Sequence, residues 1–100
     1  QLYEGWWAHL DHATGNGLGL AFDKQFFDTL WLFGTYGGWR GLHTVIPEAA
    51  TGYPGDLATA STTGRCGHLT GGQVVETETA VVVFTAKDRI EHIGTDGTVR

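Results

Sequence analysis

The carboxylate of Glu48 is the first candidate for acid–base chemistry in this sequence. Leu42 and Ile46 precede it at even spacing, so a strand over residues 42–50 would carry all three side chains on one face. A carboxylate held among apolar side chains is suited to accept a proton from a bound hydroxyl group. From the pattern alone the simpler interpretation is favoured, in which Glu48 ends a strand and points to solvent or pairs with Arg40.

Aromatic and basic side chains in a glycine-rich stretch, residues 34–41, are candidates for binding a ligand. Trp39 and Tyr36 offer flat apolar faces to the C–H side of a sugar ring, and Arg40 can donate several hydrogen bonds to hydroxyl groups. We expect this stretch to be a loop at a binding surface. Three other tryptophans are assigned to packing: Trp6, Trp7 and Trp31.

The histidines and the cysteine suggest no further chemistry. His9 and His12 would lie on opposite faces of a strand, and only His9 and Asp11 share one, so we expect no metal site. Cys66 has His68 nearby, but a lone cysteine between turns is usually inert. We expect no metal and no organic cofactor.

The composition favours strands and turns as the elements that position these residues. The 100-residue chain has 16 glycines, 41% hydrophobic and 17% charged side chains, and few of the residues that favour long helices. We predict an all-β unit spanning residues 1–100. Residues 3–12 and 18–22 are predicted to form a hairpin in which Asn16-Gly17 supplies the positive φ angles of the turn. Residues 26–33, whose start is also compatible with a helical turn, and residues 42–50 are predicted to form further strands.

The second half of the chain contains the one helix that we predict, over residues 57–62 with Asp56 as its N-cap. Residues 73–84 are predicted to form the longest strand, with 80–84 buried between two layers because both faces are apolar there. The Asp96-Gly97 pair indicates a compact hairpin near the C-terminus.

Charge and hydropathy limit the partners. The formal net charge is −5, and the six Lys and Arg are scattered, so nucleic acid is not an expected partner. No apolar run approaches the ~20 residues that cross a bilayer, and no membrane partner is expected. A single cysteine provides no disulfide framework, and a cytoplasmic location is favoured.

The stretch from residue 17 to residue 84 resembles the C-terminal part of aldose 1-epimerase-like proteins of the galactose mutarotase superfamily. The pieces that carry the resemblance cover about two thirds of the chain in the same order and spacing. They are GLGLAFD at 17–23, LW at 30–31, GGWRG at 37–41, VIPE at 45–48, GYP at 52–54 with Leu57, and LTGGQ at 69–73.

The resemblance implies an antiparallel β-sandwich that binds a hexose-like carbohydrate on a concave sheet face. It also implies that Glu48 is the catalytic base, although here proline precedes the glutamate and alanine follows it. Because the family's acid-acting histidine lies on earlier strands and its domain is longer, the chain is expected to be only part of the sandwich.

Two functions are compatible with the sequence. The first is an isomerase that interconverts sugar anomers, with Glu48 as base, Tyr36, Trp39 and Arg40 as substrate contacts, and an acid from a missing N-terminal segment or a partner chain. The second is a non-catalytic sugar-binding or assembly subunit. Because an incomplete sandwich exposes strand edges, we expect a homo-oligomer or a complementary protein chain as partner.

Overall fold

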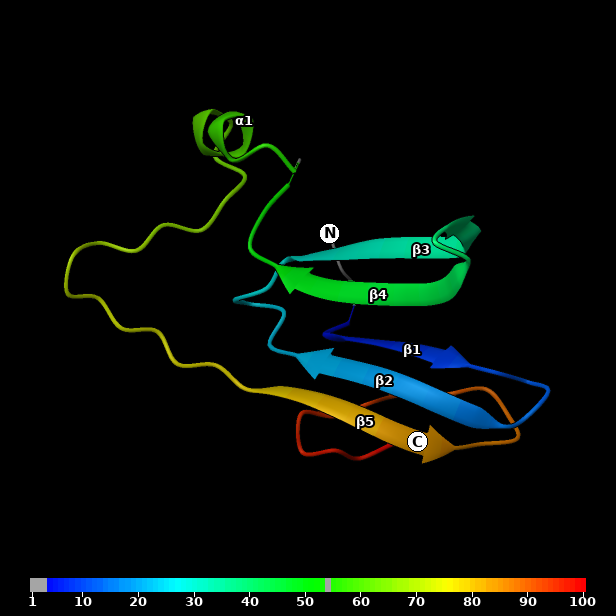
Figure 1. The fold of residues 1–100 in the computed structure, drawn as a ribbon. Coiled ribbons are helices and arrows are strands. Elements are labelled where there is room, and N and C mark those ends of the chain that lie inside the picture. The colour runs from blue at the N-terminus through cyan, green and yellow to red at the C-terminus, as the bar shows by residue number, and fades with distance from the viewer. Residues whose placement is uncertain (1–3, 54) are drawn as a thin grey trace.

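Antiparallel strands make up most of the ordered secondary structure. The computed structural model describes residues 4–53 and 55–100. One sheet has the strand order β1-β2-β5, and the other is a two-stranded hairpin of β3 and β4 (Figure 1). The elements are β1 (Trp6–Leu10), β2 (Asn16–Phe22), β3 (Thr29–Trp39), β4 (Leu42–Ala50), α1 (Leu57–Thr62) and β5 (Thr79–Thr85). The all-β prediction is confirmed at this level.

The β1–β2 hairpin forms as predicted, but a different glycine makes the turn. Gly15 has φ 75°, whereas Asn16 and Gly17 are already paired in β2, so the prediction for that pair is wrong. Asp11 organises the turn, because its carboxylate accepts hydrogen bonds from the Thr14 hydroxyl at 2.7 Å and from a backbone amide. These bonds, led by the one from Thr14, lower the pKa of Asp11 below its ordinary value.

Gly17 and Gly19 let other segments approach β2 closely. A Cβ atom on Gly17 would overlap the ring of Phe84 on β5, and one on Gly19 would overlap the side chain of Ile93. Ile93 is 1% exposed and is the largest fully buried side chain among the described residues. The C-terminal segment therefore covers one face of the three-stranded sheet.

The β3–β4 hairpin extends much further than the sequence indicates. We predicted a loop over residues 34–41, but β3 continues to Trp39 and only Arg40 and Gly41 form the turn. Both turn residues have positive φ, 51° and 71°, as a two-residue type I′ connection requires. A bulge between Tyr36 and Trp39 absorbs the extra glycines. The loop prediction is wrong because pairing with β4 overrides the local freedom of glycine.

The helix α1 spans the six predicted residues, and Asp56 is its N-cap. The strand prediction for residues 73–84 is wrong in its first half, since residues 73–78 form no strand and β5 pairs only along the seven residues of β2. The prediction that residues 80–84 are buried between two layers is also wrong, because Val81 is 73% exposed and Val83 is 81% exposed.

The C-terminal segment contains the predicted turn. Ile93 and Val99 form an isolated antiparallel bridge around it, and Gly97 has φ 85°. The Asp96 carboxylate accepts a hydrogen bond from the Thr98 amide at 2.9 Å.

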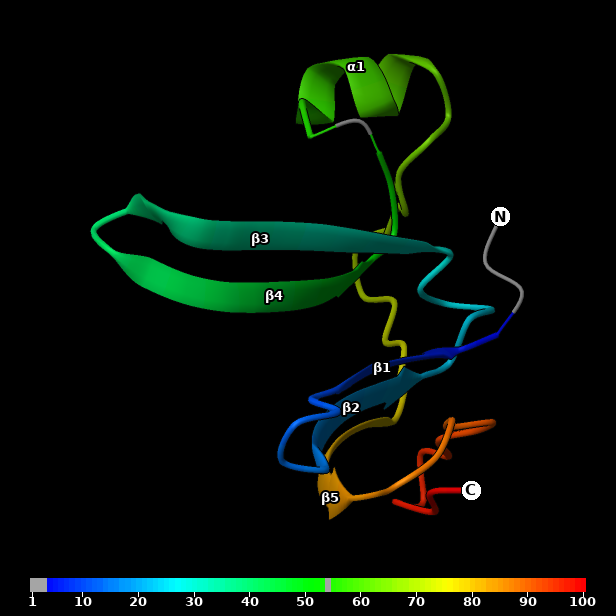
Figure 2. The same ribbon diagram turned by 90° about the vertical axis from the view of Figure 1, so that its right-hand side faces the viewer.

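The two sheets share few contacts, and the chain is expanded. Its radius of gyration is 15.8 Å, compared with about 13 Å for a compact 100-residue domain. Contacts between elements lie almost entirely within each sheet, and Figure 2 shows the β3–β4 hairpin projecting past the end of the three-stranded sheet. None of the described helices is long and apolar enough to cross a membrane.

The close approach at β2 predicts a difference between two glycines. Gly17→Ala should lower the urea midpoint of unfolding, by an amount equivalent to about 1–3 kcal/mol, because the new methyl group must displace the Phe84 ring. Gly38→Ala is the matched control, since no atom outside its neighbours lies within 4 Å of the position of a new Cβ there. Equal midpoints for the two variants would contradict the packing described for β2.

Candidate functional site

Glu48 and Trp31 face each other across the β3–β4 hairpin. The two residues are direct partners in the antiparallel register. Side chains of directly opposed residues lie on the same face of a sheet and contact each other. Glu48 and Trp31 therefore share one face of the hairpin, and Glu48 is exposed there rather than enclosed among apolar side chains.

This pair lines a cleft with a volume of about 450 Å³ between the hairpin and the segment that carries α1. The volume is within the range of small-molecule sites. Among the lining residues, Glu48, Thr51 and Cys66 have polar side chains, whereas Trp31 and Leu57 have large apolar ones. The complete lining is Trp31, Glu48, Ala50, Thr51, Gly52, Gly55, Leu57, Ala60 and Cys66.

Two contacts fix the Trp31 ring. Its Nε1 donates a hydrogen bond of 3.0 Å to the carbonyl oxygen of Gly52. Gly55 passes so close that a Cβ there would lie 2.9 Å from the ring atom Cη2. The indole is 36% exposed, so part of its surface remains available to a ligand while its orientation is set.

The other wall of the cleft depends on Asp56. Its carboxylate accepts hydrogen bonds from the amides of Ala58, at 3.1 Å, and Thr59, at 3.3 Å, and from the Thr59 hydroxyl. These bonds, led by that hydroxyl, hold the pKa of Asp56 below its ordinary value. The cap begins α1, which directs the buried Ala60 toward the cleft.

Backbone pairing closes the segment between the hairpin and the cleft wall. The Tyr53 amide donates to the carbonyl oxygen of Arg65 at 3.1 Å, and the Arg65 guanidinium lies 5.3 Å from the centre of the Tyr53 ring. Cys66 follows and lines the cleft, with its Sγ 3.5 Å from Nε2 of His68. The sequence places these two side chains two residues apart, and this spacing indicates the contact, although we expected the cysteine to be inert.

Tyr36, Trp39 and Arg40 lie at the far end of the same hairpin. Trp39 is opposite Leu42, six residues along β4 from Glu48, which corresponds to about 20 Å in an extended strand. The Arg40 guanidinium lies 5.5 Å from the centre of the Trp39 ring. Tyr36 is 85% exposed. The structure thus brings Glu48 together with Trp31, which we had assigned to packing, and does not bring it together with these three residues.

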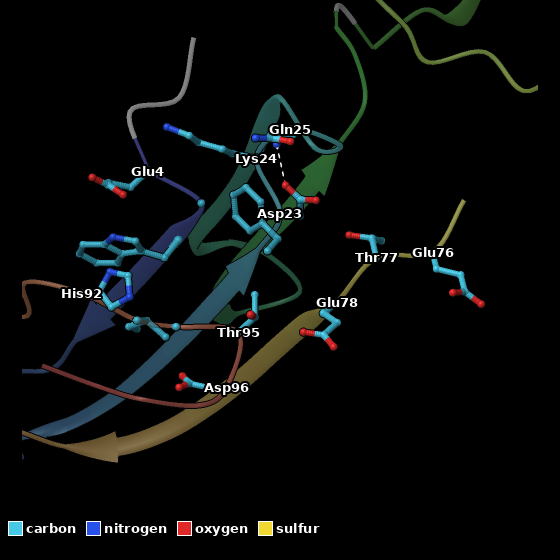
Figure 3. Close-up of a pocket in the computed structure, with 15 residues that line it drawn as sticks. Glu4, Asp23, Lys24, Gln25, Glu76, Thr77, Glu78, His92, Thr95 and Asp96 are labelled. Carbon is cyan, nitrogen blue, oxygen red and sulfur yellow. Dashed lines mark hydrogen bonds between the residues drawn. The ribbon is translucent and has the colours of Figure 1, made fainter. Parts of the chain in front are cut away.

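A second and larger cleft, of about 800 Å³, lies at the start of β1 and is shown in Figure 3. Its carboxylates are Glu4, Asp23, Glu76, Glu78 and Asp96. Trp6 also lines it, and Trp6 Nε1 is buried without a hydrogen-bond partner among the described residues. The centre of the His92 ring is 6.5 Å from that of Trp6.

The carboxylates of this larger cleft are dispersed or engaged in turns. The Asp96 carboxylate accepts hydrogen bonds from the Thr98 side chain, which has the larger effect, and from the Thr98 amide, and these bonds lower the pKa of Asp96. Asp23 accepts a bond from the Gln25 amide at 2.9 Å, drawn as the dashed line in Figure 3. No three His, Cys, Asp or Glu side chains within residues 4–53 and 55–100 gather closely enough to hold a metal ion.

No protein-family model, no curated protein and no solved structure matches this chain.

The Asp56 cap predicts a pH dependence of the cleft wall. Because its folded-state pKa lies below the unfolded value, the ionised carboxylate stabilises the folded loop at pH values above the unfolded pKa. That contribution is lost as the pH falls through the lowered folded pKa. We expect the amide resonances of Ala58 and Thr59 to titrate together with a midpoint below the ordinary value of about 3.9.

Asp56→Asn is the control for this titration, because asparagine also caps helices but carries no charge. Its Ala58 and Thr59 amides should not titrate in that range. A midpoint above the ordinary carboxyl value in the unmodified chain would contradict the hydrogen bonding described for the cap.

Proposed function

We propose that this chain binds a hexose-like sugar in the cleft beside Glu48 and that Glu48 serves there as the base of a mutarotase-like reaction. The observation that carries the proposal is that Glu48, which is exposed, and Trp31 are cross-strand partners that both line a cleft of suitable size. An indole face covers the C–H side of a pyranose, and a carboxylate accepts hydrogen bonds from its hydroxyl groups.

The chemistry of mutarotation explains what Glu48 would do. The base takes the proton of the anomeric hydroxyl group, the bond between the anomeric carbon and the ring oxygen breaks, and an acid protonates the ring oxygen. Ring closure on the other face of the carbonyl carbon reverses these proton transfers. Each positioned acid or base typically accelerates such a step about 10²–10⁴-fold.

The described cleft does not supply an obvious acid for this mechanism. Besides Glu48, its one ionisable lining residue is Cys66, which contacts His68. The resemblance to aldose 1-epimerases implies a histidine from another segment or another chain. We therefore propose that the active form contains a further contribution to this cleft.

The proposed architecture is part of a mutarotase-like β-sandwich. Support comes from the antiparallel strand order and from a face of the β3–β4 hairpin that carries large apolar side chains without a covering layer. The exposed side chains on this face beyond the cleft, as the register and alternation define it, are Phe33, Trp39, Leu42 and Ile46. A second sheet packed on this face would bury them, as in a sandwich.

The second candidate function is a non-catalytic sugar-binding subunit. The incomplete acid–base pair in the described cleft favours it, because binding needs only the ring platform and the carboxylate. Catalysis separates the two candidates, whereas sugar binding at the cleft is common to both.

Sugar binding should depend on Trp31 and not on Trp39. We expect Trp31→Ala to weaken binding of galactose or glucose about tenfold or more by isothermal titration calorimetry, because it removes the ring platform. Trp39→Ala is matched, since it removes the same side chain from the other end of the same hairpin and should leave affinity unchanged. A loss confined to Trp39→Ala would instead place the sugar at the hairpin tip.

Catalysis should depend on the ionised Glu48. If the enzyme hypothesis holds, Glu48→Gln should lower the mutarotation rate measured by polarimetry about 10²–10⁴-fold, with sugar affinity changed much less. Glu91→Gln, a neutralisation at an exposed position outside the cleft, is the control. A chain that binds the sugar but does not exceed the spontaneous rate is a binding subunit.

A further inference from the structure

The outer edge of β5 is an unpaired strand edge. β5 is the last strand in the order β1-β2-β5, and its inner edge pairs with β2 along its whole length (Figure 1). Within residues 4–53 and 55–100, no backbone hydrogen bond joins its outer edge to another segment. Such an edge presents a row of amide and carbonyl groups that can pair with another strand.

The other strand edges carry features that oppose pairing, and β5 does not. Pro47 removes an amide from the middle of β4, and a bulge interrupts β3 after Tyr36. β1 has only five residues. β5 has the sequence TAVVVFT, without charge, proline or bulge, and its register with β2 is continuous. Uncharged, β-branched segments of this kind associate readily through their edges.

The residues of β5 are also complementary to themselves. If two copies pair antiparallel about a two-fold axis at Val82, Val81 of each copy faces Val83 of the other, and the small Ala80 faces the large Phe84. Thr79 and Thr85 would face each other at the two ends. Each opposed pair is thus matched in size or polarity.

Pairing of two β5 strands would bury apolar surface, because two of the valines are exposed in the single chain. Val81 and Val83 are 73% and 81% exposed and lie on the same face as their partners Leu18 and Leu20 on β2. Pairing of two copies would place four valines side by side, and each would lose contact with water.

We propose that two copies of this chain associate through antiparallel pairing of their β5 strands, which joins the two three-stranded sheets into one continuous sheet. The partner is a second copy because the complementarity about Val82 is that of the strand with itself. Each copy carries a net charge of −5, so the association should strengthen as salt screens the repulsion.

The test is sedimentation velocity of the purified chain over a concentration series, together with two double variants. We expect the unmodified chain to show a concentration-dependent dimer that tightens with added salt. Val81→Lys with Val83→Lys should raise the dissociation constant at least about tenfold, because it sets lysines against each other across the axis. Val74→Lys is the control, since Val74 is 82% exposed and lies outside the strand.

A charge-exchanged pair keeps the proposal testable if one double variant folds poorly. A chain with Val81→Glu and Val83→Glu should not dimerise alone but should form a heterodimer with the double lysine variant. The proposal is overturned if the unmodified chain is a monomer at every concentration. A monomer in which all β5 amides resist hydrogen exchange would show that another part of the polypeptide covers the edge, and this result would also overturn the proposal. Dimerisation that is unaffected by the lysine pair also overturns it.

Discussion

The register of the β3–β4 hairpin is the constraint on which the candidate site depends. The two-residue turn at Arg40 and Gly41 sets which residue of β3 faces which residue of β4. The bulge between Tyr36 and Trp39 shifts this register by the two extra residues of β3. Because side chains alternate between faces, a slip of one residue would move Glu48 to the opposite side of the sheet from Trp31. The unusual feature is Arg40, a non-glycine residue with φ 51°, whose left-handed backbone is needed for this turn.

A second constraint is that the chain buries little of its apolar surface by itself. The three-stranded sheet is held by glycines that admit Phe84 and Ile93, and by small clusters such as Phe22 with Phe27, whose ring centres are 6.3 Å apart. The hairpin has a buried Thr35 but exposes most of its large apolar side chains. Apolar faces of this extent usually mark surfaces that other protein covers. The proposed sandwich layer and the proposed β5 pairing would cover different parts of this surface.

Sequence reasoning succeeded where local chemistry determines the structure. Asp56 defined the start of α1 because an aspartate side chain satisfies the free amides of a first turn whatever the rest of the fold. Alternation defined β4 with its bounds, and Asp96 and Gly97 indicated their turn. The long strand over residues 73–84 failed because strand length is set by the partner, and β2 offers only seven residues.

The difference between local chemistry and strand pairing also explains which residues of the candidate site could be predicted. Glu48 could be selected from its own strand, but its neighbour could not, because Trp31 is 17 positions earlier in the sequence and is brought to it only by the register. The glycines of residues 34–41 suggested a loop that would gather Tyr36, Trp39 and Arg40 around a ligand. In the hairpin these residues instead lie on a strand and its turn, where the distance along the strand separates them from the carboxylate.

The cleft and the β5 edge are structurally separate, which bears on how binding and assembly would be related. None of the residues that line the Glu48 cleft belongs to β5 or to β2, and β5 forms its strand pairing with β2 and not with the β3–β4 hairpin. A partner strand added at β5 would therefore lengthen the three-stranded sheet without entering the cleft. A sugar bound beside Trp31 would in turn leave the β5 backbone groups unchanged. Coupling between the two would require movement of the extended segment, residues 67–78, that connects the cleft wall to β5, and this segment has few hydrogen bonds to resist such movement.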